Sequence, residues 1–319
     1  MGGMNVFLSA LLTAALAAPA GAVASAADEF KDAESVLAYL KAHRDDVALV
    51  AEGIRHNADR LAPVASAIKI VHLAAYADAV RSGKVSPRER VKVSRWNAYH
   101  VPGTDGGAHE AALKRLKPGA TVTLDQLVSA MIEESDNAAA DLLRDRLGPA
   151  ALKRIAGTPV GTFNGEILRA FAGCRLSADA CLKRHVAGHR MTPVLPSFER
   201  QAAWAETVNR VRPAVLRDVL ARLAKDPTAR KHLEWPMRQP GADPGTLVIG
   251  TKGGSLPGVL SEATYTVRPG ERPRHTVLAL RRMPERTWFS AMQSYAHQRF
   301  MLQVATDPAF RARVRAALK

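Results

Sequence analysis

The chain has 319 residues, 47% of them hydrophobic and 24% charged, which is enough to bury the core of one large domain or two small ones. Its formal net charge is +15, but the basic residues are spread along the chain without a dense tract or interleaved aromatic side chains. This distribution argues against a nucleic-acid partner and favours long-range attraction to an anionic cell envelope or anionic substrates.

The first 26 residues have the pattern of a secretory signal. Val6 to Ala24 is an apolar, alanine-rich run, and Ala24-Ser25-Ala26 matches the small-x-small pattern of a cleavage site. We therefore predict a signal peptide over 1–26, a mature domain over 27–319 and a secreted or periplasmic protein. A retained membrane anchor is the alternative.

Export would place the two cysteines in an oxidising compartment. Cys174 and Cys181 are seven positions apart, so they can close a small loop as a disulfide, although two unpaired thiols fit the spacing as well.

The mature chain begins with an amphipathic helix over 29–43 and a first strand over 46–51. The periodicity of residues 63–80 predicts a buried helix that Ser66 opens, and Lys69 returns to the same face one turn later. A serine becomes a strong nucleophile when a neighbouring base takes its proton, and a lysine in apolar surroundings can be that base.

The middle of the chain is predicted to be helical. Thr123 and Gln126 form a capping box at the start of one helix, and a second helix follows over 138–147. Ser135-Asp136-Asn137 lies between them, where the structural role is a helix junction with Asp136 turned inward to hold the turn. The same junction would place Ser135 and Asn137 in a cleft.

Residues 157–196 are the least regular segment. His185 and His189 are four positions apart, but a basic loop without a suitably spaced carboxylate predicts solvated histidines, so we expect no metal site and no cofactor. Further towards the C-terminus the pattern predicts one helix, three strands and a final long helix, over 208–223, 247–252, 260–267, 275–281 and 287–304.

Three motifs stand in order along the chain: Ser66-x-x-Lys69, Ser135-Asp136-Asn137 and Lys252-Gly253-Gly254-Ser255. Together they resemble the penicillin-recognising serine hydrolases, and their surroundings resemble class A β-lactamases most. The resemblance implies an α/β (α+β) fold of the β-lactamase/transpeptidase type, with an antiparallel sheet from 46–65 and 245–283 flanked by helices. The helical part would span 66–235 and form an all-helical subdomain.

The resemblance also implies a role for each motif residue. Ser66 would be the nucleophile, Lys69 its base and Ser135 the proton relay to the leaving group. The substrate-binding residues would be Asn137, which contacts the substrate amide; Lys252, which pairs with a substrate carboxylate; Gly254, which lets the substrate backbone approach; and Ser255, whose backbone N–H would form the oxyanion hole with that of Ser66.

An aromatic side chain near the mouth of the active site is also implied by the resemblance. Trp96 or Tyr99 is at a suitable distance along the chain, and the alternative is a loop aromatic that packs on its neighbours.

Two departures from the family pattern concern turnover. The Glu-x-x-Leu-Asn sequence that supplies the deacylating base in class A enzymes is absent between Gly157 and Pro196, where Glu166 is the nearest candidate and Glu199 another. The strand motif also carries Gly253 where the family has a threonine or serine hydroxyl. Loss of one general base slows a reaction by ~10²–10⁴, so slow deacylation is expected.

The leading hypothesis is an exported serine hydrolase that forms an acyl-enzyme on Ser66 and opens β-lactams, with slow turnover. The alternatives are an esterase, amidase or D-alanyl peptidase acting on another acyl substrate, and a β-lactam-binding sensor without turnover. The expected partner is a small acyl compound, either a β-lactam or a peptidoglycan-like molecule, with no nucleic acid, and the expected state is a monomer.

Overall fold

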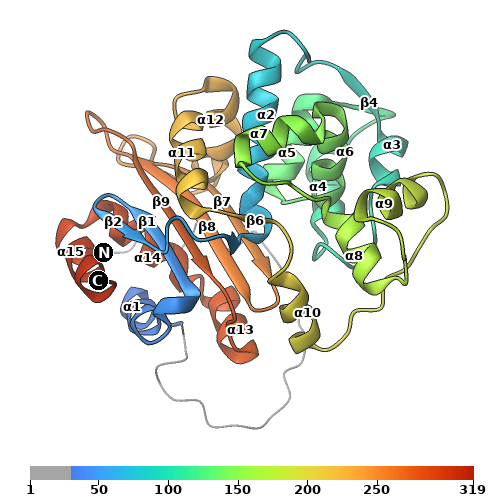
Figure 1. Ribbon diagram of the computed structural model, residues 1–319. Helices are drawn as coiled ribbons and strands as arrows, with labels where there is room; N and C mark the ends of the chain where they lie inside the picture. Colours follow the sequence, from blue (N-terminus) through green and yellow to red (C-terminus); the bar gives the residue numbers. More distant parts are fainter. Residues whose placement is uncertain (1–29) are drawn as a thin grey trace. The chain divides into compact units, whose positions relative to one another are not determined.

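The computed structural model describes residues 30–319, so the predicted signal peptide lies outside the described residues. Within that range the chain divides into two compact units (Figure 1). The sheet unit contains residues 30–67, 198–224 and 234–319, and the helical unit contains 68–197 and 225–233. None of the helices between residues 30 and 319 has both the length and the apolar character needed to span a membrane.

The sheet unit is built on a five-stranded antiparallel sheet of order β2-β1-β9-β8-β7. Its strands are β1 (Val47–Ala51), β2 (Ile54–His56), β7 (Val248–Leu256), β8 (Val259–Val267) and β9 (Arg274–Leu280). The prediction that the first strand joins the last three in one antiparallel sheet is confirmed, with β1 paired to β9. The strand predicted over 247–252 does not stop at its glycines but continues to Leu256, because every residue from Val248 onward pairs with β8.

Helices cover the sheet and bury its apolar side chains. Leu49 and Leu278 pack in the main core with residues of α1, α14 and α15, whereas Val50 packs on Ala214 of α11. Since neighbouring residues of a strand point to opposite faces, these helices lie on both faces of the sheet. The helical and short strand elements of this unit are α1 (Ala33–Ala42), η2 (Arg44–Asp46), β3 (Ala62–Pro63), η3 (Ala65–Ile68), α10 (Phe198–Ala205), β6 (Arg210–Val211), α11 (Pro213–Leu223), η4 (Trp235–Arg238), α13 (Glu285–Ser294), α14 (Ala296–Thr306) and α15 (Pro308–Ala317).

The long C-terminal helix predicted over 287–304 is two helices. Tyr295 has φ 52°, in the left-handed region, and separates α13 from α14. Its backbone N–H bonds to Ala291 O and ends the first helix. The apolar periodicity continues across this residue, so the pattern concealed the break.

The helical unit packs around α2, whose residues from Lys69 to Ala77 are all buried. Its elements are α2 (Lys69–Arg81), β4 (Arg90–Lys92), α3 (Val93–Ala98), α4 (Ala108–Leu116), β5 (Thr121–Thr123), α5 (Leu124–Glu133), α6 (Asn137–Leu147), α7 (Pro149–Ala156), α8 (Phe163–Phe171), α9 (Ala178–Val186) and α12 (Pro227–Leu233). The fold class is therefore confirmed as mixed α/β with an antiparallel sheet.

Two local predictions for the helical unit have different outcomes. The capping box of α5 is present, with Gln126 N donating to Thr123 Oγ1 at 3.1 Å and Thr123 N donating to Gln126 Oε1 at 2.8 Å. The segment 157–196, expected to be irregular, contains α8 and α9. A disulfide joins Cys174 in the loop between them to Cys181 in α9, with a Cα–Cα distance of 6.1 Å.

Candidate active site

Ser66 lies in a tight turn of the sheet unit, in the 3₁₀ segment η3. The preceding Ala65 has φ 41°, a left-handed conformation that is strained for a residue with a side chain. The turn is closed by Ala67 N, which donates to Val64 O at 2.9 Å, and Ser261 Oγ of β8 donates to the same carbonyl at 2.6 Å. The nucleophile candidate is therefore positioned by the sheet itself.

Strand β7 approaches the backbone of Ser66 at Gly254. A Cβ built on Gly254 would lie 2.4 Å from Ser66 N and 2.5 Å from Ala67 N, distances at which no side chain fits. The sequence predicted a glycine here for the approach of a substrate backbone; what the structure shows at Gly254 is a close approach to the chain's own backbone. Ser255, the next residue, pairs with Leu260 of β8.

Lys252 is buried in the middle of β7, with 5% of its surface exposed, and its Nζ donates to Gly253 O at 2.6 Å. Glu262 of β8 is opposite Gly253 in the register. Burial lowers the pKa of the Lys252 ammonium and raises that of the Glu262 carboxyl, and the attraction between the two opposes both shifts. A buried acid thus accompanies the lysine of this strand, which the motif itself does not reveal.

Lys69 is completely buried in the helical unit, at the first position of α2. Its Nζ donates to Ser135 O at 2.5 Å, to Ser135 Oγ at 3.2 Å and to Asn137 Oδ1 at 2.7 Å. The first two motifs, more than sixty residues apart in sequence, are therefore in direct contact through the lysine amine. A proton can pass between Lys69 and the Ser135 hydroxyl over this distance.

The Ser135-Asp136-Asn137 junction has the predicted capping geometry. Ser135 has φ 70°, and Asp136 Oδ1 accepts hydrogen bonds from Ala138 N at 2.7 Å and Ala139 N at 3.3 Å at the start of α6. The side chain of Asp136 is fully buried, so its inward orientation is confirmed. This cap fixes the backbone on which Ser135 and Asn137 are displayed.

Two residues that sequence reasoning did not connect with this junction hold Asp136 from behind. Trp96 Nε1 donates to Asp136 Oδ2 at 2.8 Å, and His109 Nδ1 lies 3.1 Å from the same oxygen. Trp96 is fully buried and Tyr99 is 3% exposed, with the Tyr99 hydroxyl donating to Asp145 at 2.7 Å. Both aromatics are packed against their neighbours, as the packing alternative predicts.

Phe163, the first residue of α8, packs over the Lys69 amine with its ring centroid 4.4 Å from Nζ. Its backbone N–H donates to Asp141 Oδ1 at 2.7 Å, and Asn164 N donates to Asp141 Oδ2 at 2.9 Å. Burial raises the pKa of Asp141 to about 7, against the effect of these two donors. These two hydrogen bonds hold the backbone at the start of α8, from which the Phe163 ring extends.

The two candidates for a deacylating base, Glu166 and Glu199, lie on separate helices. Glu166 lies further along α8, and its Oε2 is 3.4 Å from Arg169 Nε. Glu199 is exposed on α10 of the sheet unit. The residue that α8 places against Lys69 is an aromatic one.

Of the two histidines considered for a metal, His185 is buried in protein contacts, unlike the solvated side chain predicted, and His189 is exposed. His185 Nδ1 accepts from Met191 N at 3.2 Å, and His185 Nε2 lies 3.1 Å from His100 O. Between residues 30 and 319 there is no cluster of three or more histidine, cysteine, aspartate or glutamate side chains arranged to hold a metal ion.

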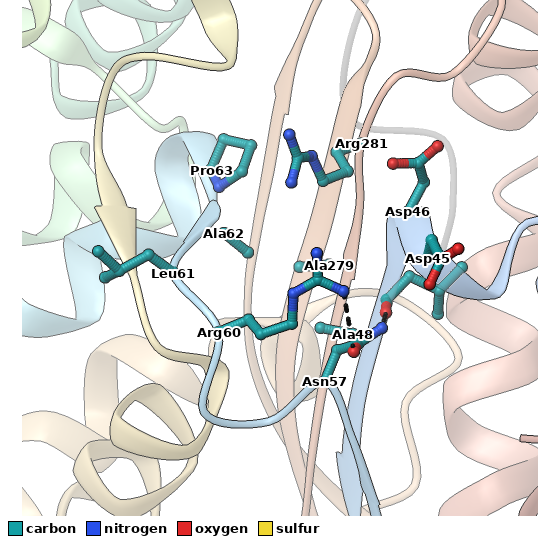
Figure 2. A pocket seen from close by; sticks show the side chains of 11 residues that line it. Asp45, Asp46, Ala48, Asn57, Arg60, Leu61, Ala62, Pro63, Ala279 and Arg281 are labelled. Carbon is teal, nitrogen blue, oxygen red and sulfur yellow. Dashed lines mark hydrogen bonds between the residues drawn. The ribbon is translucent and has the colours of Figure 1, made fainter. Parts of the chain in front are cut away.

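A small cavity of the sheet unit lies elsewhere, beside β1 and β3 (Figure 2). Its charged lining comes from Asp45, Asp46, Arg60 and Arg281, and it includes none of the motif residues. None of the candidate catalytic residues therefore lines this cavity.

The model of the β-lactamase enzyme family matches residues 38–279. The chain belongs to this family. The match covers all three motifs, from Ser66 to Ser255, so the family resemblance of the sequence is confirmed. Among curated proteins, no significant match is found.

Solved structures of this β-lactamase type share the fold at low identity. A β-lactamase from Sphaerobacter thermophilus aligns with a TM-score of 0.55 and 21% identity over 86% of this chain and 97% of its own. A variant of the class A β-lactamase of the last common ancestor of Gram-negative bacteria aligns with a TM-score of 0.53 and 19% identity over 87% of this chain and 100% of its own. PBP-A aligns with a TM-score of 0.50 and 18% identity over 85% and 96%. A variant of PBP-A is described as an acyl-enzyme complex with penicillin G, at the same score and coverage.

Proposed function

We propose that this β-lactamase family member is an exported serine acyl-hydrolase that forms an acyl-enzyme on Ser66 and opens β-lactams with slow turnover. The observation that carries the proposal is the contact of Lys69 Nζ with Ser135 Oγ at 3.2 Å and with Asn137 Oδ1 at 2.7 Å. A buried amine in contact with a second hydroxyl supports proton transfer during acylation.

The proposed acylation starts from the neutral amine of Lys69. The Ser66 oxygen attacks the carbonyl carbon of the substrate, and its proton passes to Lys69 directly or through water. The backbone N–H groups of Ser66 and Ser255 stabilise the oxygen that gains negative charge. The C–N bond then breaks, Ser135 gives its proton to the leaving nitrogen, and Lys69 returns the proton to Ser135. The product is an ester of Ser66, and Lys69 ends in the protonation state in which it began.

Deacylation is the step for which the chain lacks the family's base. A water molecule must be deprotonated to attack the ester, and a carboxylate usually does this in class A enzymes. Phe163 packs on Lys69 and cannot accept a proton, so the acyl-enzyme is expected to persist. A persistent β-lactam adduct favours a second candidate function, a D-alanyl peptidase or a β-lactam-binding protein without turnover.

Export and a monomeric state belong to the same proposal. The apolar run before Ala24-Ser25-Ala26 supports a cleaved signal, and the Cys174–Cys181 disulfide is typical of oxidising compartments. A periplasmic or secreted enzyme would meet both β-lactams and peptidoglycan-like acyl substrates there.

Intact-protein mass spectrometry tests the proposal. The mature protein and Ser66→Ala are mixed with a chromogenic cephalosporin or a penicillin, and both the adduct and free product are followed over time. A Ser66-dependent adduct that decays slowly while product accumulates supports slow hydrolysis, and a stable adduct selects the second candidate. Absence of an adduct with both compounds refutes the β-lactam assignment.

A further inference from the structure

The lysine strand β7 has a glycine where the family resemblance leads one to expect a hydroxyl, and the neighbouring strand explains why. Gly253 is opposite Glu262 of β8, and a Cβ built on Gly253 would lie 2.8 Å from Glu262 Oε2. The Glu262 carboxyl group therefore occupies the space beside position 253. The missing hydroxyl has been replaced by an acid from the next strand.

Glu262 is held in this place by several donors. It is 2% exposed, Thr251 Oγ1 donates to its Oε1, and Gln298 Nε2 of α14 donates to its Oε2 at 3.2 Å. His297 Nε2 lies 3.9 Å from Oε2, and burial lowers the pKa of His297 to about 4, so this imidazole is neutral at pH 7. Burial raises the pKa of the Glu262 carboxyl, and the donors on two sides together with Lys252 act against this rise by favouring the carboxylate form.

The charge of this carboxylate acts on the lysine that is expected to bind the substrate. Lys252 precedes Gly253 in β7, and Glu262 attracts the Lys252 ammonium, which raises the pKa of this lysine against the effect of burial. Two opposite charges in a buried region offset each other's field. A substrate carboxylate that approaches Lys252 is therefore also repelled by Glu262. A substrate carboxylate would therefore gain little from Lys252.

We propose that Glu262 determines the substrate preference at β7, so that the chain takes acyl substrates with a neutral ester or amide group where penicillins carry a carboxylate. This inference rests on the proposed function, because it concerns which acyl compound reacts with Ser66. Glu262 acts as a specificity residue through Lys252 and the space at Gly253, and has no part in proton transfer.

A matched substrate pair tests this inference. The probes are a penicillin and its methyl ester, which differ only in the charged group. For the wild-type chain, Ser66 acylation by the ester is expected to be faster than by the acid. In Glu262→Gln, which keeps the shape and can still accept from Gln298, the acid-to-ester rate ratio should rise about tenfold because the repelling charge is gone. Glu271→Gln, which removes an exposed acid paired with Arg274, is the control and should leave the ratio unchanged.

The outcomes separate this inference from the proposed function. If neither probe gives a Ser66 adduct, the proposed function fails, and equilibrium binding of the same pair to Ser66→Ala, measured by calorimetry, decides the inference instead. Tighter binding of the ester supports it; equal binding, tighter binding of the acid, or binding of neither overturns it. If adducts form but the wild-type chain prefers the acid, or the ratio in Glu262→Gln does not change, the inference is also overturned. If Glu262→Gln does not fold, the wild-type preference decides alone.

Discussion

The ring of Phe163 lies over the amine of Lys69, with 4.4 Å between its centroid and Nζ. An aromatic ring attracts a cation through its negative face but cannot remove a proton from water. This pair therefore links the buried lysine of the first motif to the start of α8. The first prediction follows from this position.

Phe163→Glu is expected to shorten the lifetime of the Ser66 adduct, because it places a carboxylate beside Lys69 from which water can be activated. A gain of about 10²-fold in the decay rate is expected, near the lower end of the effect of one general base. Mass spectrometry of the adduct after removal of free penicillin measures the decay. Phe163→Gln is the matched uncharged control; equal decay in the two variants would show that ring removal alone is responsible.

Gly254→Ala should impair acylation, because the new methyl group would lie 2.4 Å from Ser66 N and force β7 away from the nucleophile turn. The expected loss is about tenfold or more in the rate of adduct formation, since small displacements of reacting groups are costly. Gly119→Ala, at a position where nothing lies within 4 Å of an added Cβ, is the control. Normal acylation by Gly254→Ala would show that the backbone approach is not required.

Trp96→Phe should lower the free energy of unfolding by about 2 kcal/mol, because it leaves the buried carboxylate of Asp136 without one donor. Denaturant titration measures this value. Tyr99→Phe also removes one hydrogen bond to an acid, but Asp145 is 32% exposed and water can replace the hydroxyl, so a smaller loss is expected. Equal losses would contradict a special role for the Asp136 contact.

His72→Phe should make the protein more resistant to acid. Burial lowers the pKa of His72 from 6.5 to about 3 in the folded state. As the pH falls below 6.5, His72 therefore becomes protonated in the unfolded state but stays neutral in the folded state. Because only the unfolded state gains this proton, the free energy of unfolding falls progressively between pH 6.5 and 3. Between pH 6.5 and 5 the wild-type chain should lose about 2 kcal/mol through this group.

Chemical denaturation at pH 7 and pH 5 measures the effect of His72. The difference between the two pH values should be smaller in His72→Phe than in wild type by that amount. His189→Phe, at an exposed position, is the matched control and should keep the wild-type difference. An unchanged pH dependence in His72→Phe would mean that His72 is accessible to protons in the folded state.

Local patterns in the sequence predicted much of the fold. The period of the apolar residues located α2, α5 and α11, and the alternation and turn residues located β8 and β9. Such signals succeed because they report interactions between residues that are near in the chain, as in the capping box of Thr123 and Gln126. The break at Tyr295 and the helices α8 and α9 were missed because no local signal was strong enough to mark them.

The sequence by itself determined the family, because three short motifs follow one another in order and each can be recognised locally. They are Ser66 with Lys69, the Ser135 junction and the Lys252 strand. Only the tertiary structure showed that Trp96 and His109 hold Asp136, that Phe163 covers Lys69 and that Glu262 fills the space at Gly253. These relationships join residues that are distant in the chain. Their energies depend on packing distance and burial, and periodicity and spacing carry no information about either.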